Sequence, residues 1–199
     1  SICPNYDVKI FEDKVEQSVL NELYNLSDLT INIANNEGFG LGTAESLMAG
    51  TPIIVNVTGG LQDQCGFKMD GKYLTADDYV KIGSLHDKRK YEGTEHGEWV
   101  KPIWPVRSTA GSIPTPYIFD DRVNTDEVAD GILKIYQMNG EERKNIGLKG
   151  REFAINNLSS KIMCDKMYEG ITTAIENFKP KKRFNLYKVR WVNQQYYLE

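Results

Sequence analysis

The chain has 199 residues, of which 40% are hydrophobic and 26% charged, so it can form one domain with a sizeable core or two small ones. Its net charge of -4 gives no broad basic field, and we do not expect nucleic acid as a partner. No run approaches the roughly 20 apolar residues of a transmembrane helix, and no signal-type apolar stretch opens the chain. These features predict a cytoplasmic protein without a transmembrane segment.

The cysteines and the start of the chain bear on disulfide bonds, metal sites and the extent of the protein. Cys3, Cys65 and Cys164 are odd in number and lack CxxC spacing, so neither a disulfide framework nor a zinc site is expected. We interpret Cys65 as a small buried hydrophobe. The first residue is Ser1, and no complete first unit of a fold precedes the first strand-like run. We therefore expect a fragment of a longer protein.

The first 60 residues alternate short β-branched runs with runs at helical spacing. The predicted elements are strands at 7–11, 29–34 and 53–57 and helices at 15–26 and 43–49, the second helix ending at Gly50. This β-α-β-α-β order implies a parallel sheet in an α/β fold. Loops that follow parallel strands lie at the carboxyl edge of the sheet, where such sheets bind ligands. We expect the loops at 11–15, 35–42 and 58–60 to meet there.

Beyond residue 64 the pattern decays into a polar segment that runs to about Ile113. A helix capped by Asn124 or Thr125 and ending near Gln137 is predicted next, and another opens after Asn139 and Gly140. A further helix over 158–178 has an apolar stripe, made of Leu158, Ile162, Met167, Ile171 and Ile175. The aromatic tail, 179–199, suggests a docking segment rather than free disorder.

Histidines and tryptophans in the polar segment allow more than one interpretation. His86 and His96 have no repeating ligand spacing, so we interpret them as solvated residues rather than as a metal site. Trp99 and Trp104 are expected to anchor a small core of this segment, with stacking on sugar as the alternative. We expect neither a metal nor a cofactor.

The stretch from Asn36 to Glu45 places alternating glycines at a strand-to-helix junction, with a carboxylate near each end. Glycines let the backbone approach a ligand closely, and the N–H groups of residues 41–43 would face an anion at the start of the helix. The G-x-G-x-G order is not a dinucleotide fingerprint, and no Lys follows as in a P-loop. The pattern predicts a phosphate or diphosphate site.

Glu37 and Glu45 flank this anion site, and carboxylates repel phosphate unless they face other groups. An ionised carboxylate accepts two hydrogen bonds from a vicinal diol, each worth about 1.5–3 kcal/mol. Hydroxyls on either side of a diphosphate predict a nucleoside diphosphate sugar. The simpler alternatives are a first-turn Glu45 stabilised by the helix dipole, a surface acid at Glu37, and a plain turn at Gly59 and Gly60.

These residues resemble a known family. Glu37-Gly-Phe-Gly-Leu-Gly-Thr-Ala-Glu45, followed by Ala49-Gly50-Thr51-Pro52 and Thr58-Gly59-Gly60, is similar to the donor-site signature of retaining GT-B glycosyltransferases of the glycosyltransferase 1 group. This group includes glycogen synthase, sucrose synthase and many mannosyltransferases. The resemblance covers roughly residues 7–65 and 115–178.

The resemblance implies a Rossmann-like parallel sheet with helices on both faces, which is the C-terminal half of a GT-B fold. It implies a nucleotide-sugar-binding domain over 1–178 with an insertion at about 66–113, and a tail at 179–199. Glu37 would be the catalytic residue that positions the donor sugar, and Glu45 would bind the ribose diol. The other donor-binding residues that it implies are Val15, Gly38, Phe39, Gly40, Leu41, Gly42, Thr43, Thr58, Gly59 and Gly60.

The family also has an Arg and a Lys that neutralise the diphosphate, and an N-terminal acceptor domain, and neither has a counterpart in this sequence. We expect a metal-independent retaining hexosyltransferase with a GDP-mannose or UDP-glucose type of donor, inactive as this chain alone. The acceptor would be a glycan, a lipid-linked group or a protein. A nucleotide-sugar epimerase and a non-catalytic nucleotide-sugar-binding module are the alternatives.

The basic cluster at 179–183 would be a solvated face or, more weakly, a contact with an anionic membrane surface.

Overall fold

The computed structural model describes residues 7–82, 94–110, 119–180, 189–192 and 195–198. Contacts divide the chain into two compact units, Ser1–Ser160 and Lys161–Glu199. The helices of the first unit are α1 (Gln17–Leu26), α2 (Leu41–Ala49), α3 (Leu61–Gln64), α4 (Ala76–Ile82), α5 (Thr125–Gln137) and α6 (Gly140–Asn157). Its strands are β1 (Thr30–Asn32), β2 (Ile53–Asn56), β3 (Lys68–Met69), β4 (Lys72–Tyr73), β5 (Val100–Ile103), β6 (Arg107–Ala110) and β7 (Phe119–Arg122).

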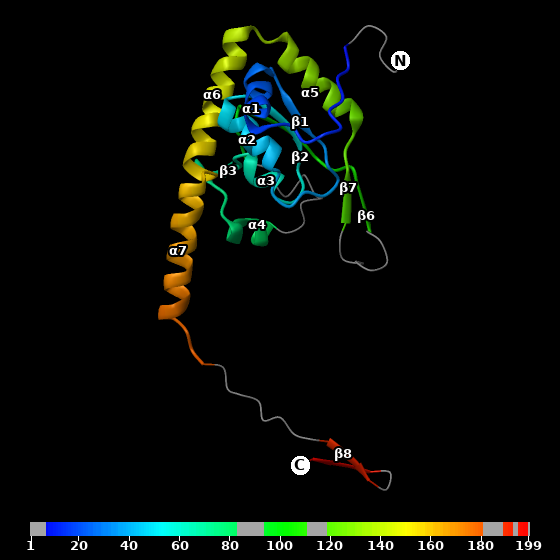
Figure 1. Ribbon diagram of the computed structural model, residues 1–199, viewed down its shortest axis with the longest axis vertical. Helices are drawn as coiled ribbons and strands as arrows, with labels where there is room; N and C mark the ends of the chain where they lie inside the picture. Colours follow the sequence, from blue (N-terminus) through cyan, green and yellow to red (C-terminus); the bar gives the residue numbers. More distant parts are fainter. Residues whose placement is uncertain (1–6, 83–93, 111–118, 181–188, 193–194, 199) are drawn as a thin grey trace. The chain divides into compact units, whose positions relative to one another are not determined.

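A three-stranded parallel sheet in the order β1-β2-β5 forms the centre of the first unit (Figure 1). The central strand β2 is buried at every position, and Ile53 pairs with Thr30 on one side and with Val100 on the other. Strands buried on both faces consist of β-branched residues without polar alternation, as in Ile53-Ile-Val55. The predicted α/β class is confirmed.

Successive side chains of β2 point to opposite faces of the sheet, and each face packs on helices. Ile54 joins Ile103 and Val128 of α5 in one buried cluster. Ile53 and Val55 belong to the other cluster, which includes Leu47 of α2, Leu61 of α3 and Phe153 of α6. Helices therefore cover both faces, and the predicted Rossmann-like arrangement is confirmed.

Residues 7–11 form no strand, and the prediction of one there is wrong. Val8, Ile10 and Phe11 are all exposed, and β1 pairs with β2 alone among the described strands. Alternating apolar residues favour extended backbone, but a strand also needs a partner to bond with its backbone groups. The observed elements begin with α1, so residues 11–15 do not follow a strand.

The polar segment contributes to the main core, contrary to the sequence interpretation. It supplies β5 to the central sheet. Trp99 is buried in the main cluster, stacks on Phe153 at a centroid distance of 4.7 Å, and donates its indole N–H to the Gln64 carbonyl at 3.0 Å. Trp104 packs against the same cluster. The two tryptophans therefore do not anchor a separate small core.

Several local predictions are confirmed. Asn124 caps α5, as predicted. The predicted helix after residue 139 is also present, but it begins at Gly140 and not at Glu141, because Asn139 is its N-cap, in a capping box with Glu142. Gly50 ends α2 in the left-handed region with φ +88°. Cys65 is buried, and burial raises the pKa of its thiol, so it is a packing residue and not a reactive thiolate.

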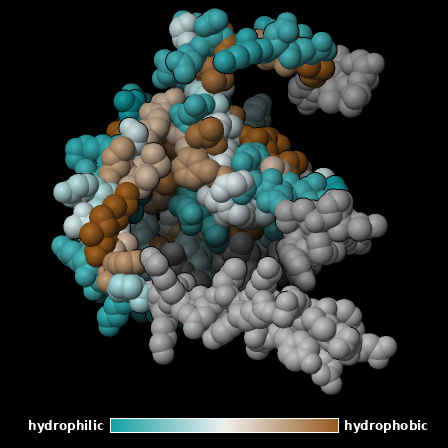
Figure 2. All heavy atoms as spheres, turned by 60° about the horizontal axis from the view of Figure 1, so that its bottom comes forward, coloured by the Kyte–Doolittle hydropathy of each residue, from teal (hydrophilic) through white to brown (hydrophobic). Residues whose placement is uncertain are grey.

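The second unit contains all of α7 (Ser160–Glu176) except its first residue, and the antiparallel hairpin β8 (Val189–Val192) and β9 (Gln195–Leu198). The hairpin lies in the tail, for which the sequence pattern gave no element. Met167, Ile171 and Ile175 of the predicted stripe are exposed, and so are many other large apolar side chains of the chain. Figure 2 shows apolar side chains at several places on one face.

Cys3 and His86 lie outside the described residues, as do residues 111–118 and 181–188. None of the helices in the described ranges combines the length and the apolar character needed to cross a bilayer.

Truncation of Ile54 to alanine is expected to lower the free energy of unfolding by about 2–5 kcal/mol. The side chain is fully buried between β2 and α5, and its removal leaves a cavity in the sheet face. Denaturant titration measures the effect. Ile132→Ala, on the half-exposed side of α5, is the control and should change stability by less than about 1 kcal/mol. Equal losses in both variants would contradict the assigned core.

Candidate functional site

The loops after β1 and β2 lie directly against each other. The N–H of Gly60 donates to the Glu37 carbonyl at 3.1 Å. A Cβ on Gly59 would overlap the Glu37 carbonyl oxygen, and a Cβ on Gly60 would overlap the Gly38 carbonyl oxygen. Residues with side chains do not fit at these two positions, so the glycine pair allows the loops to touch. The predicted meeting of the loops at 35–42 and 58–60 is confirmed.

A buried glutamine fastens the end of the first loop. Gln64 of α3 donates from its amide nitrogen to the Phe39 carbonyl at 2.6 Å and to the Gly40 carbonyl at 2.9 Å. Its side chain is fully buried, so these bonds are made away from water. Sequence reasoning missed Gln64, because nothing in its local pattern indicates a partner more than twenty residues away.

A second set of buried polar groups fastens the start of the same loop. Asn56, at the end of β2, donates to the Ala34 carbonyl at 2.9 Å and to the Asp121 carbonyl at 3.0 Å. The hydroxyl of Thr58 donates to the Asp121 carboxylate at 2.8 Å, and the N–H of Asp121 donates to the Asn35 carbonyl at 2.8 Å. The hairpin of β6 and β7 thus braces both loops. Asn56 and Asp121 were also missed, although a polar residue at the end of a buried strand was a usable signal.

Helix α2 begins at Leu41, two residues earlier than predicted, because Gly40 takes the left-handed conformation with φ +86° and ends the loop. The first helical hydrogen bond is donated by Ala44 to the Gly40 carbonyl at 3.1 Å. The amides of residues 41–43 precede it and so have no acceptor within the helix, and no side chain caps them. This end of α2 carries the partial positive charge of the helix dipole.

Glu45 is the fifth residue of α2 and lies in its second turn, so the expectation of a first-turn carboxylate is wrong. The helix dipole therefore gives little reason for a glutamate at this position. Its side chain is exposed, and the hydroxyl of Tyr24 donates to its Oε2 at 3.3 Å. Burial, followed by the charge of Glu45 and this hydrogen bond, raises the pKa of Tyr24, so the phenol stays protonated at neutral pH.

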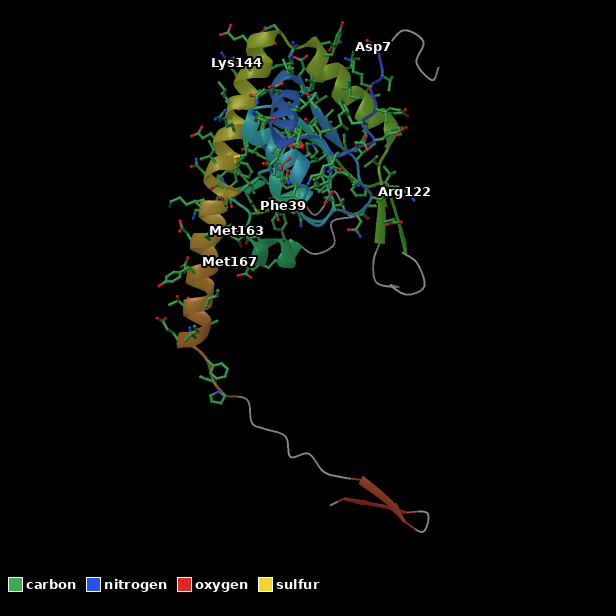
Figure 3. The ribbon with its side chains drawn as sticks, in the orientation of Figure 1. Asp7, Phe39, Arg122, Lys144, Met163 and Met167 are labelled. Atoms are coloured by element: carbon green, nitrogen blue, oxygen red, sulfur yellow. The ribbon has the colours of Figure 1, made fainter. Side chains whose placement is uncertain are left out.

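A groove of about 610 Å³ runs along the outer side of α2, between α1 and α6. It is lined by Gln17, Leu20, Asn21, Tyr24, Asn25, Phe39, Leu41, Ala44, Glu45, Met48, Ala49, Arg151 and Leu158. Among these residues Glu45 is the one carboxylate and Arg151 the one cation. Leu41 and Met48 of α2 add apolar surface to its lining. Figure 3 labels Phe39 on the loop that leads into this helix.

The structure brings the predicted residues together in two groups. Phe39, Leu41 and Glu45 line the groove beside α2. Glu37, Gly38, Gly59 and Gly60 meet through their main chains where the two loops touch. Glu37 is a half-buried residue and, like Val15 ahead of α1, is not among the residues that line the groove.

A larger groove, of about 880 Å³, lies elsewhere on the unit. The β3–β4 hairpin, residues 94–99 and α6 line it, and none of its lining residues belongs to the loops at 35–42 or 58–60. His96 is at this groove and its Nδ1 is 2.8 Å from the Gly97 carbonyl oxygen. No three His, Cys, Asp or Glu side chains of the described ranges gather as metal ligands would.

Comparison with known proteins shows a partial similarity to a glycosyltransferase. No protein-family model matches the chain. A segment of 87 residues is 41% identical to a D-inositol 3-phosphate glycosyltransferase of Thermomonospora curvata. The aligned segment covers 41% of this chain and 20% of that protein. The chain thus matches about a fifth of the length of this relative. The resemblance inferred from the residues is confirmed at the level of a distant, partial similarity to a glycosyltransferase.

Replacement of Gly59 by alanine is expected to separate the two loops and to lower the free energy of unfolding by about 2 kcal/mol or more. The added Cβ would overlap the Glu37 carbonyl oxygen, and the residue has a φ of +47°. Thermal or denaturant unfolding measures the loss. Gly38→Ala in the partner loop is the matched control, because a Cβ there meets nothing within 4 Å. A Gly59→Ala variant as stable as Gly38→Ala would contradict the observed loop contact.

Proposed function

We propose that the chain binds a nucleoside diphosphate sugar and is the donor-binding part of a retaining glycosyltransferase. The observation that carries the proposal is the start of α2, where the amides of residues 41–43 have no acceptor within the helix and Leu41 lines a groove whose one carboxylate is Glu45. The partial similarity to a glycosyltransferase also supports this proposal.

The diphosphate would lie against the amides of residues 41–43. A helix N-terminus offers N–H donors and positive partial charge, and both favour a phosphate. As the bond between the sugar and the phosphate breaks, negative charge grows on the departing oxygen. Donors that are already in place stabilise this charge without reorganisation, so they would accelerate the transfer as well as bind the donor.

The nucleoside would occupy the groove beside α2. Glu45 accepts hydrogen bonds there, and the ribose 2′ and 3′ hydroxyls are a vicinal diol that can donate two of them. Leu20, Leu41 and Met48 provide apolar surface for a base. The backbone ahead of α1, at Val15, would contact the edge of the base.

The sugar would lie at the junction of the two loops. Glu37 is next to glycine backbone there, and its carboxylate would accept hydrogen bonds from sugar hydroxyls. Its role would be to position the sugar and not to attack it. In the proposed reaction the acceptor hydroxyl forms a bond with the anomeric carbon on the face that the phosphate leaves. The proton of that hydroxyl passes to a phosphate oxygen, and no metal is required.

Calorimetric titration of the chain with GDP, UDP, GDP-mannose and UDP-glucose tests the donor site. We expect saturable binding of one nucleotide and of its sugar derivative. Glu45→Ala should weaken that binding about 100-fold or more, since two hydrogen bonds to a charged group are lost. Glu22→Ala is the matched control, because this exposed carboxylate on α1 is not among the residues that line the groove. Absence of binding to all four compounds would contradict the proposal.

Glu37→Ala tests the sugar position separately. We expect the affinity for the bare nucleoside diphosphate to stay within about twofold. The affinity for its sugar derivative should fall by about tenfold, because only the sugar loses a charge-assisted hydrogen bond. The ratio of the two affinities is the measurement. An unchanged ratio would remove Glu37 from the sugar site even if nucleotide binding is retained.

A further inference from the structure

Tyr24 is the described residue that connects α1 with the carboxylate of the groove. It lines the groove and is half-buried. Its own carbonyl accepts a hydrogen bond from the hydroxyl of Thr51 at 2.6 Å, and that residue lies in the turn between α2 and β2. Its backbone is therefore held to the same part of the fold that carries α2.

The phenol of Tyr24 reaches across the first turn of α2. A Cβ on Gly42 would lie 3.2 Å from the Tyr24 hydroxyl, so this oxygen passes close over the glycine. Glu45 is three residues further along the helix and lies on the same side. The hydroxyl donates to Glu45 Oε2 at 3.3 Å, and Oε1 is left available to a ligand.

We propose that Tyr24 is a positioning residue that orients the Glu45 carboxylate for the ribose diol, and so helps to select ribonucleotides over deoxyribonucleotides. The inference rests on the proposed function. An exposed glutamate has freely rotating torsions, and its ordering on binding reduces the affinity. A phenol that holds one carboxylate oxygen restricts those torsions before the ligand arrives. Tyr24 acts through Glu45 and not on the reacting atoms.

The chemistry of the two groups supports this role. A carboxylate only accepts hydrogen bonds and a protonated phenol can donate one, so the pair is complementary. Since burial, the charge of Glu45 and the hydrogen bond all raise the pKa of Tyr24, the donor is present throughout the neutral range. Arg151 lines the groove too, but no hydrogen bond or ion pair joins it to Glu45 among the described residues.

Tyr24→Phe tests the inference, because it removes the hydroxyl and keeps the ring. Titrations would use GDP and UDP together with their 2′-deoxy forms. We expect the variant to bind the preferred ribonucleotide about fivefold more weakly and the deoxy form nearly as well as the original chain does. The preference for ribose should therefore shrink about fivefold. Tyr136→Phe, an exposed tyrosine on α5, is the control and should leave both affinities unchanged.

A double-mutant cycle separates positioning from packing. In a Glu45→Ala background, Tyr24→Phe should have no further effect on nucleotide affinity, since the carboxylate that it orients is gone. Equal weakening of the ribo and deoxy forms, or the same loss in both backgrounds, would show a packing role and overturn the inference. If the original chain binds a ribonucleotide and its deoxy form equally well, Glu45 does not act at the ribose, and the inference is overturned. Failure of GDP and UDP to bind at all would overturn the proposed function itself, and this inference with it.

Discussion

The contact between the main chains of the two loops is the constraint on which the rest of the site depends. Strands β1 and β2 are parallel neighbours, so their loops leave the sheet side by side. Gly59 and Gly60 let them touch at Glu37 and Gly38, with no side chain between them. Once the first loop is held there, its remaining residues must turn within a short span to reach α2. Gly40 makes that turn with a positive φ, and the helix begins at the next residue.

Polar groups that the loop itself does not contain hold this geometry in place. Gln64 donates hydrogen bonds to the carbonyls of Phe39 and Gly40, and it is completely buried. Buried hydrogen bonds of this kind specify one arrangement, since breaking them leaves unpaired groups away from water. The end of the loop therefore fixes the direction of the amides at the start of α2 before any ligand binds. Preorganised donors of this kind bind an anion at a lower entropic cost than donors on a mobile loop.

The sequence predicted the elements that local patterns specify and missed those that depend on distant partners. The strands at 29–34 and 53–57 and the helix between them were found from β-branched runs and a terminal glycine, and the structure has β1, β2 and α2 there. The segment at 7–11 has the same alternation yet forms no strand, because alternation does not supply a pairing partner. In contrast, β5 contains Lys101 and Pro102 and was hidden in a polar segment, although pairing with β2 makes it part of the core.

The candidate site was likewise predicted where a local pattern specifies it. The corrected start of α2 changes the expected position of Glu45 relative to the amides. The glycine pattern predicted the start of α2 but placed it two residues late, which put Glu45 beside the free amides. With Leu41 as the first residue, Glu45 is four residues further on, about 6 Å along the helix axis. In the proposed site the end of the helix would offer amides to an anion, and its side would offer a carboxylate to hydroxyls. A ligand that carries both groups, one helical turn apart, satisfies the two together, whereas a free phosphate or a free sugar satisfies only one of them.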